Sequence, residues 1–177
     1  MWGQIAEFTK NLANQTGLSD QGALIGVTTY GSSSRLLIKL SDHTEYKNFA
    51  AAVDGLLATR KKEWGTILRQ GLARALDEMF DVANGARPSF KKVLILVTDG
   101  ECSNCGAEEA EYSKLADRIK DADIRMLMIG VGITYDEVTD FNIAEFVGRD
   151  DFTELKDYKD LIGPKLLDEM AVVCDGK

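Results

Sequence analysis

The stretch that decides the fold is Lys92 to Gly100, which reads KVLILVTDG. Its middle is an uninterrupted apolar run, which is typical of a strand in a sheet that is covered on both faces. Asp99 and Gly100 end the run, and Asp-Gly is a common turn pair. The stretch therefore predicts a buried strand with a carboxylate at its carboxyl end.

Strands and helices alternate on both sides of this strand. Ile124–Val131 (IRMLMIGV) is a second buried-strand run, and a short strand is expected at Phe152–Leu155. Ala23–Tyr30 and Arg35–Leu40 lie so close in sequence that they can only form a hairpin. The order indicates an α/β sheet with right-handed crossovers. Helices are expected through Trp2, Ile5, Phe8 and Leu12; Phe49, Val53, Leu56 and Leu57; Ile67, Leu68, Leu72, Leu76 and Phe80; Leu115 and Ile119; Phe141, Ile143 and Phe146; and Leu161, Leu166 and Met170, the last with a kink at Pro164.

The composition fits one globular domain over residues 1–177. Of the 177 residues, 45% are apolar, and 21 Lys and Arg stand against 29 Asp and Glu, a formal net charge of −8. A chain of this length can fold without a disulfide scaffold or a structural metal. The acidic balance argues against nucleic-acid binding and suits cations or a basic partner. No apolar run approaches the roughly 20 residues that span a bilayer, and the first residues have no features of an export signal.

Two oxygen-bearing residues are candidate cation ligands. Ligands of open α/β sheets bind at the carboxyl ends of strands, where Asp99 is expected. Its carboxylate can coordinate a cation or cap the following turn, and the spacing leaves both interpretations open. Thr66 begins the third helix, where its hydroxyl can ligate a hard cation or, more commonly, cap the helix.

Cys102 and Cys105 form a Cys-x-x-Cys motif between the strong strand and the next helix. Three interpretations compete, namely a local disulfide or idle thiols, a catalytic dithiol, and half of a zinc site. Gly106 and the acidic residues after it oppose the lowered thiol pKa of a redox pair. A zinc site needs two more ligands, and only Cys174 and His43 remain as soft candidates.

The motifs of the common enzyme classes are missing from the sequence. His43 is the single histidine, so a Ser-His-Asp triad needs distant residues to converge, and there is no Gly-x-Ser-x-Gly elbow. No Walker loop or Gly-x-Gly-x-x-Gly follows a strand. The sequence therefore predicts a protein that is not an enzyme.

Taken together, these segments resemble a von Willebrand factor A domain of the integrin inserted-domain type. The resemblance rests on GVTTY at 26–30, WGT at 64–66, KVLILVTDG at 92–100 and IGVG at 129–132, and on a last helix that runs to Cys174. These motifs stand in the family's order and at its spacing. The resemblance implies a doubly wound, mostly parallel sheet with helices on both faces and one antiparallel edge hairpin.

The resemblance also implies a metal-ion-dependent adhesion site (MIDAS), which holds Mg²⁺ or Mn²⁺ and is completed by an acidic residue of the partner. Carried onto this sequence, its threonine is Thr66 and its third-loop aspartate is Asp99, with Glu101 beside them on the partner-binding face. The family's Asp-x-Ser-x-Ser loop has no counterpart, and Leu68 and Arg69 stand where the family often has Thr-Gly. One carboxylate and one hydroxyl make a poor cage, so we expect Mg²⁺, Mn²⁺ or Ca²⁺ to bind this chain alone weakly or not at all.

A central strand is missing by the same resemblance, between the strands at Ala23–Tyr30 and Lys92–Thr98. Unpaired backbone groups inside a sheet are strongly unfavourable. Three solutions are open: a strand from another chain or a swapped copy, direct pairing of the two flanking strands, or residues upstream. We expect an omitted or separately supplied segment, so that the domain over 1–177 is N-terminally incomplete.

Two further features of the sequence, Cys174 and a glycosylation motif at Asn14, are of a kind found in extracellular proteins. Many secreted members of the family pair a cysteine at the end of the last helix with one before the first strand, so Cys174 resembles half of such a bridge. Asn14-Gln15-Thr16 matches a glycosylation acceptor, although a single match arises readily by chance. By analogy with the family, we expect an extracellular or secreted protein.

The leading hypothesis is a non-enzymatic adhesion or matrix module that binds a protein partner, such as a collagen-like one, through Thr66 and Asp99. One alternative is a metal-independent interaction domain that uses the acidic surface or the Cys102–Cys105 loop. Another is a dithiol oxidoreductase that uses Cys102 and Cys105.

Overall fold

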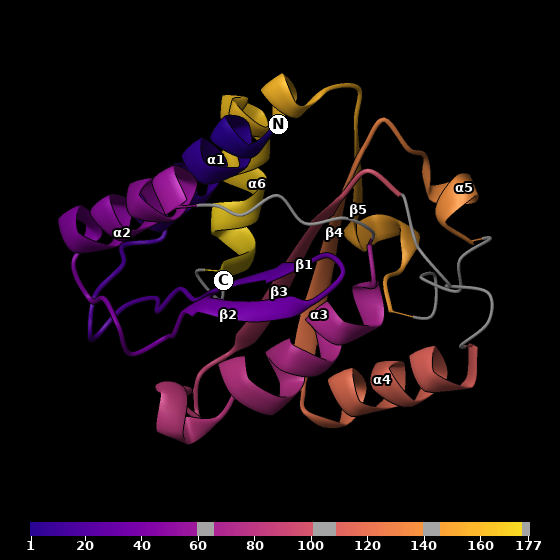
Figure 1. Ribbon diagram of the computed structural model, residues 1–177, viewed down its shortest axis with the longest axis horizontal. Coiled ribbons are helices and arrows are strands. Elements are labelled where there is room, and N and C mark those ends of the chain that lie inside the picture. The colour runs from indigo at the N-terminus through magenta and orange to yellow at the C-terminus, as the bar shows by residue number, and fades with distance from the viewer. Residues whose placement is uncertain (60–65, 101–108, 140–145, 175–177) are drawn as a thin grey trace.

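The computed structural model describes residues 1–59, 66–100, 109–139 and 146–174, in which helices pack around two β-sheets (Figure 1). Within these residues, no helix is both long enough and apolar enough to cross a membrane. The helices are α1 (Trp2–Gln15), α2 (Tyr46–Thr59), α3 (Leu68–Arg74), α4 (Glu109–Asp121), α5 (Tyr135–Thr139) and α6 (Pro164–Cys174), with shorter turns η1 (Ala75–Met79), η2 (Val82–Asn84), η5 (Arg149–Asp151) and η6 (Tyr158–Ile162).

The strands form a parallel sheet and a separate hairpin. β3 (Lys92–Thr98) pairs in parallel with β4 (Ile124–Val131), and β4 pairs in parallel with β5 (Phe152–Leu155). β1 (Val27–Tyr30) and β2 (Ser34–Ile38) pair with each other in an antiparallel hairpin. The structure confirms the α/β class, the hairpin and the parallel strands that the sequence predicts.

Each face of the parallel sheet has its own helices. Leu96 and Met128 point to one face, where they pack with residues of α3 and α4. Leu127 and Ile129 point to the other face, where they pack with residues of α1 and α6. Cover on both faces explains why β3 and β4 carry long apolar runs, Val93–Val97 and Met126–Val131, instead of alternating apolar and polar residues. A third cluster, which includes Phe49, joins α1 and α2 to the hairpin.

The third predicted helix is interrupted. It is regular only over α3 and continues as the π-helical turn η1, and the extended residue Asp81 then separates η1 from the 3-10 turn η2. Gly85 ends η2 with a left-handed φ of 97°, where glycine carries no steric penalty. Of the helix expected through Phe141 and Ile143, residues 140–145 lie outside the described residues, and α5 precedes them.

The expected kink at Pro164 is wrong. Pro164 is the first residue of α6, and Gly163 separates this helix from the 3-10 turn η6. The first position of a helix suits proline because an N–H there has no partner within the helix. The proline therefore starts a helix instead of bending one.

The hairpin and the parallel sheet have no backbone pairing with each other. Within the described residues, β1 pairs only with β2, and β3 pairs only with β4. Direct pairing of the two strands that flank the missing one, which the sequence left open, is therefore wrong. A side chain connects them instead, because the hydroxyl of Tyr30 donates a hydrogen bond to the main-chain oxygen of Val97 at 3.2 Å.

Candidate functional site

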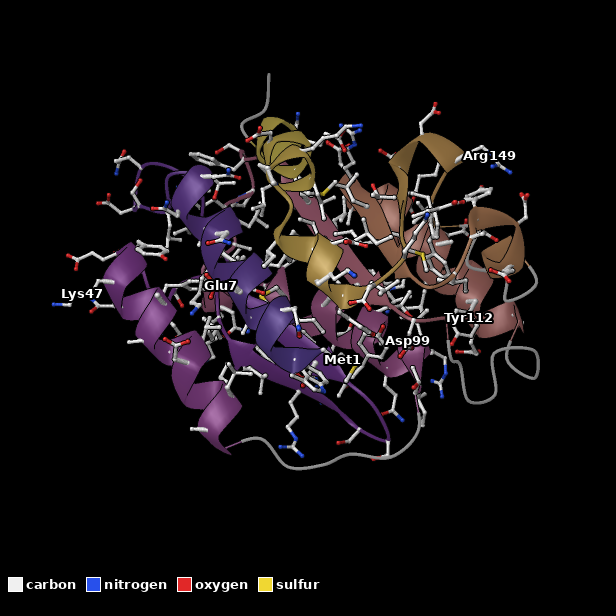
Figure 2. The ribbon with its side chains drawn as sticks, turned by 90° about the horizontal axis from the view of Figure 1, so that it is seen from above. Met1, Glu7, Lys47, Asp99, Tyr112 and Arg149 are labelled. Atoms are coloured by element: carbon white, nitrogen blue, oxygen red, sulfur yellow. The ribbon has the colours of Figure 1, made fainter. Side chains whose placement is uncertain are left out.

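Asp99 lies exposed at the carboxyl end of β3 (Figure 2). Its Oδ2 accepts a hydrogen bond from the hydroxyl of Tyr158, in η6, at 3.3 Å. Thr98 before it is only 6% exposed, and its Oγ1 accepts the N–H of Gly100 at 3.1 Å. Gly100 has a left-handed φ of 79°, and a Cβ atom there would overlap the side chain of Ile133. The backbone turn is therefore held by the Thr98 hydroxyl and packed against Ile133, whereas Asp99 is exposed to solvent.

Thr66 lies half-buried in the residues that lead into α3. The N-cap of α3 is Ile67, which makes no side-chain cap, so the interpretation of Thr66 as the helix cap is wrong. The N–H of Ile67 donates to the main-chain oxygen of Gly31, just after β1, at 3.0 Å. This bond fastens the segment that carries Thr66 to the carboxyl end of β1.

The first turn of α3 takes its hydrogen-bond acceptor from α4. Tyr112 of α4 is 1% exposed, and its hydroxyl accepts the N–H of Arg69 at 3.2 Å (Figure 2). Such an N–H is normally paired by a local Ser, Thr, Asp or Asn side chain. The ring of Phe146 packs edge-on against Tyr112, with 5.9 Å between the ring centroids. Tyr112 thus holds α4 against the helix that follows Thr66.

Tyr30 brings the carboxyl ends of β1 and β3 together. Its ring packs on Gly71 of α3, where an added Cβ would lie 2.8 Å from the Cβ of Tyr30. Burial raises the pKa of Tyr30 to about 12, hydrogen bonding with Thr98 opposes the rise, and the negative charge of Asp99 adds to it. The hydrogen bond from the Tyr30 hydroxyl to Val97 brings the side chain of this β1 residue to the end of β3, two residues before Asp99.

The structure therefore places Thr66 and Asp99 at the same edge, linked through Gly31 and Tyr30. In the part of the chain that the structure describes, no group of three or more His, Cys, Asp or Glu side chains could hold a metal ion. Glu101 lies outside the described residues. The described residues supply one carboxylate and one hydroxyl, which do not fit the six-oxygen cage that Mg²⁺ prefers.

The raised pKa of Tyr30 predicts a loss of stability in alkali. Between its ordinary pKa near 10 and its folded pKa of about 12, the folded state binds more protons than the unfolded state, so the free energy of unfolding falls as pH rises. We expect Tyr30 to account for a loss of about 1 kcal/mol between pH 9 and pH 11. Urea unfolding at both pH values checks this, because Tyr30→Phe should remove that part of the loss. Tyr46→Phe, at an exposed site on α2, should keep it, and an equal loss in both variants would contradict the assignment to Tyr30.

The family model of the von Willebrand factor type A domain matches residues 1–163. The chain belongs to the von Willebrand factor type A domain family. This domain is similar to matrilin-1 of Gallus gallus, 31% identical over 128 residues that make up 72% of this chain and 24% of that protein. It is also similar to matrilin-1 of Mus musculus, 29% identical over 173 residues, 97% of this chain and 33% of that protein. The chain thus spans about a quarter to a third of these curated relatives.

A solved structure shows the same fold. Proximal thread matrix protein 1 from the mussel byssus, with a zinc-occupied MIDAS motif, superposes on this von Willebrand factor A domain with a TM-score of 0.76 at 18% identity. The superposition covers 98% of this chain and 43% of that one. The likeness supports the α/β architecture expected from the sequence.

Among the described candidate residues of this von Willebrand factor A domain, Asn14 and His43 lie on α1 and beside Phe49 of α2. Asn14 is exposed in the last turn of α1, but the hydroxyl of Thr16 in the same motif is buried and donates to the main-chain oxygen of Leu12 at 2.9 Å. His43 packs edge-on against Phe49, with 6.4 Å between centroids. Glycosylation at Asn14 stays a prediction. So does the disulfide or dithiol between residues 102 and 105, which lie outside the described residues.

Sequence reasoning missed the three tyrosines that shape the site. Tyr30, Tyr112 and Tyr158 come from β1, α4 and η6, and each hydroxyl bonds to a residue far away in the sequence. No residue spacing in the sequence of this von Willebrand factor A domain predicts these three hydrogen bonds, because they depend on how the helices and strands pack.

Proposed function

We propose that this chain is a non-enzymatic protein-binding module of an adhesion or extracellular-matrix protein. Its family membership and its similarity to matrilin-1 support this role. The observation that carries the proposal is the exposed carboxylate of Asp99 at the carboxyl edge of β3, held there by the turn at Gly100. By the same similarity, we place the protein outside the cell and propose a matrix protein, such as a collagen-like one, as its partner.

We further propose that the partner contacts the edge that carries Thr66 and Asp99, together with Glu101. An exposed carboxylate on an acidic chain favours a cation or a basic group of the partner. A divalent ion at this edge is consistent with the zinc-occupied MIDAS of the mussel protein. Because the described residues alone do not fit a complete cage, we expect Mg²⁺, Mn²⁺ or Ca²⁺ to bind weakly unless further ligands are supplied.

The test is partner binding with and without metal. On a collagen-coated surface in Mg²⁺, Asp99→Ala should weaken binding at least about tenfold, because it removes the exposed carboxylate of the site. EDTA should have the same effect on the unaltered chain. Asp117→Ala, which removes an exposed carboxylate from the surface of α4, is the matched control and should bind normally. Equal binding by Asp99→Ala and Asp117→Ala would contradict the role of this edge.

A metal-independent interaction domain is the second candidate. It is favoured by the observation that the described residues contain no three-ligand metal cluster. In this case partner binding persists in EDTA and fails when the acidic surface or the segment 102–105 is changed. A dithiol oxidoreductase would instead reduce insulin disulfides, and Cys102→Ser would abolish that activity.

A further inference from the structure

Asn84 and Gly85 form the only Asn-Gly pair of the sequence. An asparagine side chain reacts most readily with the main-chain nitrogen that follows it when the next residue is glycine, because no Cβ hinders the approach. The attack forms a cyclic succinimide and releases ammonia, and water then opens the ring to aspartate or isoaspartate. The pair is therefore a candidate modification site that the proposed function does not use.

Hydrogen bonds in the folded chain hold both reacting groups of this pair. The N–H of Gly85 donates to the main-chain oxygen of Val82 at 3.0 Å and closes the 3-10 turn η2. The side-chain Nδ2 of Asn84 donates to the main-chain oxygen of Glu78, in η1, at 2.7 Å. The attacking nitrogen must lose its proton and the Nδ2 group must leave as ammonia, so the reaction requires that both bonds break.

The turn that contains these groups is held by few side chains. None of the three residues of η2 is buried, and Val82 is 64% exposed. The hydrogen bonds of a 3-10 turn also have poorer geometry than those of an α-helix. A segment with few buried apolar contacts opens at a lower free energy than the core of the protein. We therefore expect η2 to open while the parallel sheet stays intact.

The product of the reaction cannot restore the bonds of Asn84. A carboxylate accepts hydrogen bonds but donates none, so the bond to the Glu78 oxygen is lost. The main-chain oxygen of Asn84 also accepts the N–H of Ser41 at 3.1 Å, and a Cβ added at Gly85 would lie 2.5 Å from the Ser41 nitrogen. Isoaspartate inserts a methylene group into the main chain at this close contact. Conversion therefore separates the loop before α2 from the end of η1.

We propose that Asn84 is a site of spontaneous conversion to aspartate and isoaspartate, which proceeds only while η2 is open and leaves the turn unable to close again. The Gly85 nitrogen forms a bond to Cγ of Asn84, and Nδ2 leaves as ammonia with the proton of Gly85. Water then breaks one C–N bond of the ring. Cleavage at Cγ gives aspartate, and cleavage at the main-chain carbon gives isoaspartate. The loop at Ser41 is released as the protein ages, independently of any partner at Asp99.

The first test measures conversion in the whole chain at pH 8, by peptide mass spectrometry and by enzymatic methylation of isoaspartate. Asp81→Ala removes the carboxylate that caps η2 by accepting the N–H of Ala83 at 2.8 Å. We expect conversion of Asn84 to be at least about fivefold faster in this variant, because the turn opens more often without its cap. Asp81→Asn is the matched control. It removes the same charge but keeps a capping oxygen, so it should convert at the unaltered rate.

The second test makes the aspartate product directly with Asn84→Asp. The amides of Ser41 and Gly85 should exchange with solvent at least about tenfold faster in this variant, while those of β4 change little. Asn48→Asp places the same charge on the exposed surface of α2 and should leave the exchange at Ser41 unchanged. Unchanged exchange at Ser41 in Asn84→Asp would contradict the release of the loop.

Three further results would overturn the proposal. Equal conversion in Asp81→Ala and Asp81→Asn would show that opening of η2 does not control the reaction. Conversion as fast in the folded chain as in guanidinium chloride would show that the bonds of η2 do not protect Asn84. A rate that follows the exchange of the buried β4 amides as denaturant is raised would show that global unfolding is required. These assays contain no partner and no metal, so their results are independent of the binding proposed for Asp99.

Discussion

Gly100→Ala is expected to lower the free energy of unfolding by about 2–4 kcal/mol. Two penalties add at this position. The backbone is left-handed, with a φ of 79°, which strains any residue with a Cβ. The added Cβ would also overlap the side chain of Ile133, which is 8% exposed and has little room to move. Urea unfolding followed by circular dichroism measures the loss.

Gly132 provides the matched control for this prediction. It also has a left-handed φ, 75°, but an added Cβ there meets nothing within 4 Å. Gly132→Ala should therefore show the backbone penalty alone, about 1 kcal/mol. Equal losses in the two variants would show that the contact with Ile133 contributes nothing. Because the turn at Gly100 also positions Asp99, a soluble Gly100→Ala protein should bind its partner more weakly than Gly132→Ala.

Tyr112→Ala is expected to destabilise the protein by about 3–5 kcal/mol. The side chain is 1% exposed and packs against Phe146, so truncation removes a large buried ring and leaves a cavity. Tyr112→Phe keeps the ring and removes only the hydroxyl that accepts the N–H of Arg69. We expect that variant to lose about 1 kcal/mol, the usual contribution of a helix cap. Thermal or urea unfolding of the two variants separates packing from capping.

A local readout distinguishes the capping role from a general loss of stability. In Tyr112→Phe, the amides of Leu68 and Arg69 should exchange faster with solvent, while those of β4 change little. Tyr46→Phe, on the exposed surface of α2, should alter neither stability nor exchange. Uniform acceleration across the sheet in Tyr112→Phe would contradict the assignment of its hydroxyl to the first turn of α3.

Much of the parallel sheet could be predicted from the sequence. β3 and β4 occupy the residues that their apolar runs indicate, because a strand covered on both faces leaves a continuous signal. The hairpin was predicted correctly as a pair, but β1 begins only at Val27, four residues after the expected start at Ala23. Ala23, Leu24 and Ile25 are apolar like the strand that follows them, so the sequence alone does not show where backbone pairing with β2 begins. Pro164 was misplaced because proline breaks a helix and starts one equally well.

The candidate site was predictable only in part. Asp99 could be placed because an acidic turn directly after a buried strand must lie at the carboxyl edge of the sheet. The role of Thr66 could not be settled, because a hydroxyl before a helix satisfies the pattern of a cap whether or not it caps. The hydroxyl of Tyr112 accepts an N–H of the first turn of α3 instead, and Tyr112 lies 43 positions after its partner Arg69 in the sequence. Contacts of this kind depend on how elements pack, and a single sequence carries no local signal for them.

The hydrogen bond between Tyr30 and Val97 also bears on the order of events in folding. These two residues lie 67 positions apart in the sequence, and within the described residues no backbone pairing joins the hairpin to the parallel sheet. Contacts between residues far apart in the sequence require the closure of a long loop, which costs chain entropy. We therefore expect the docking of the hairpin beside the parallel sheet to be a late step of folding.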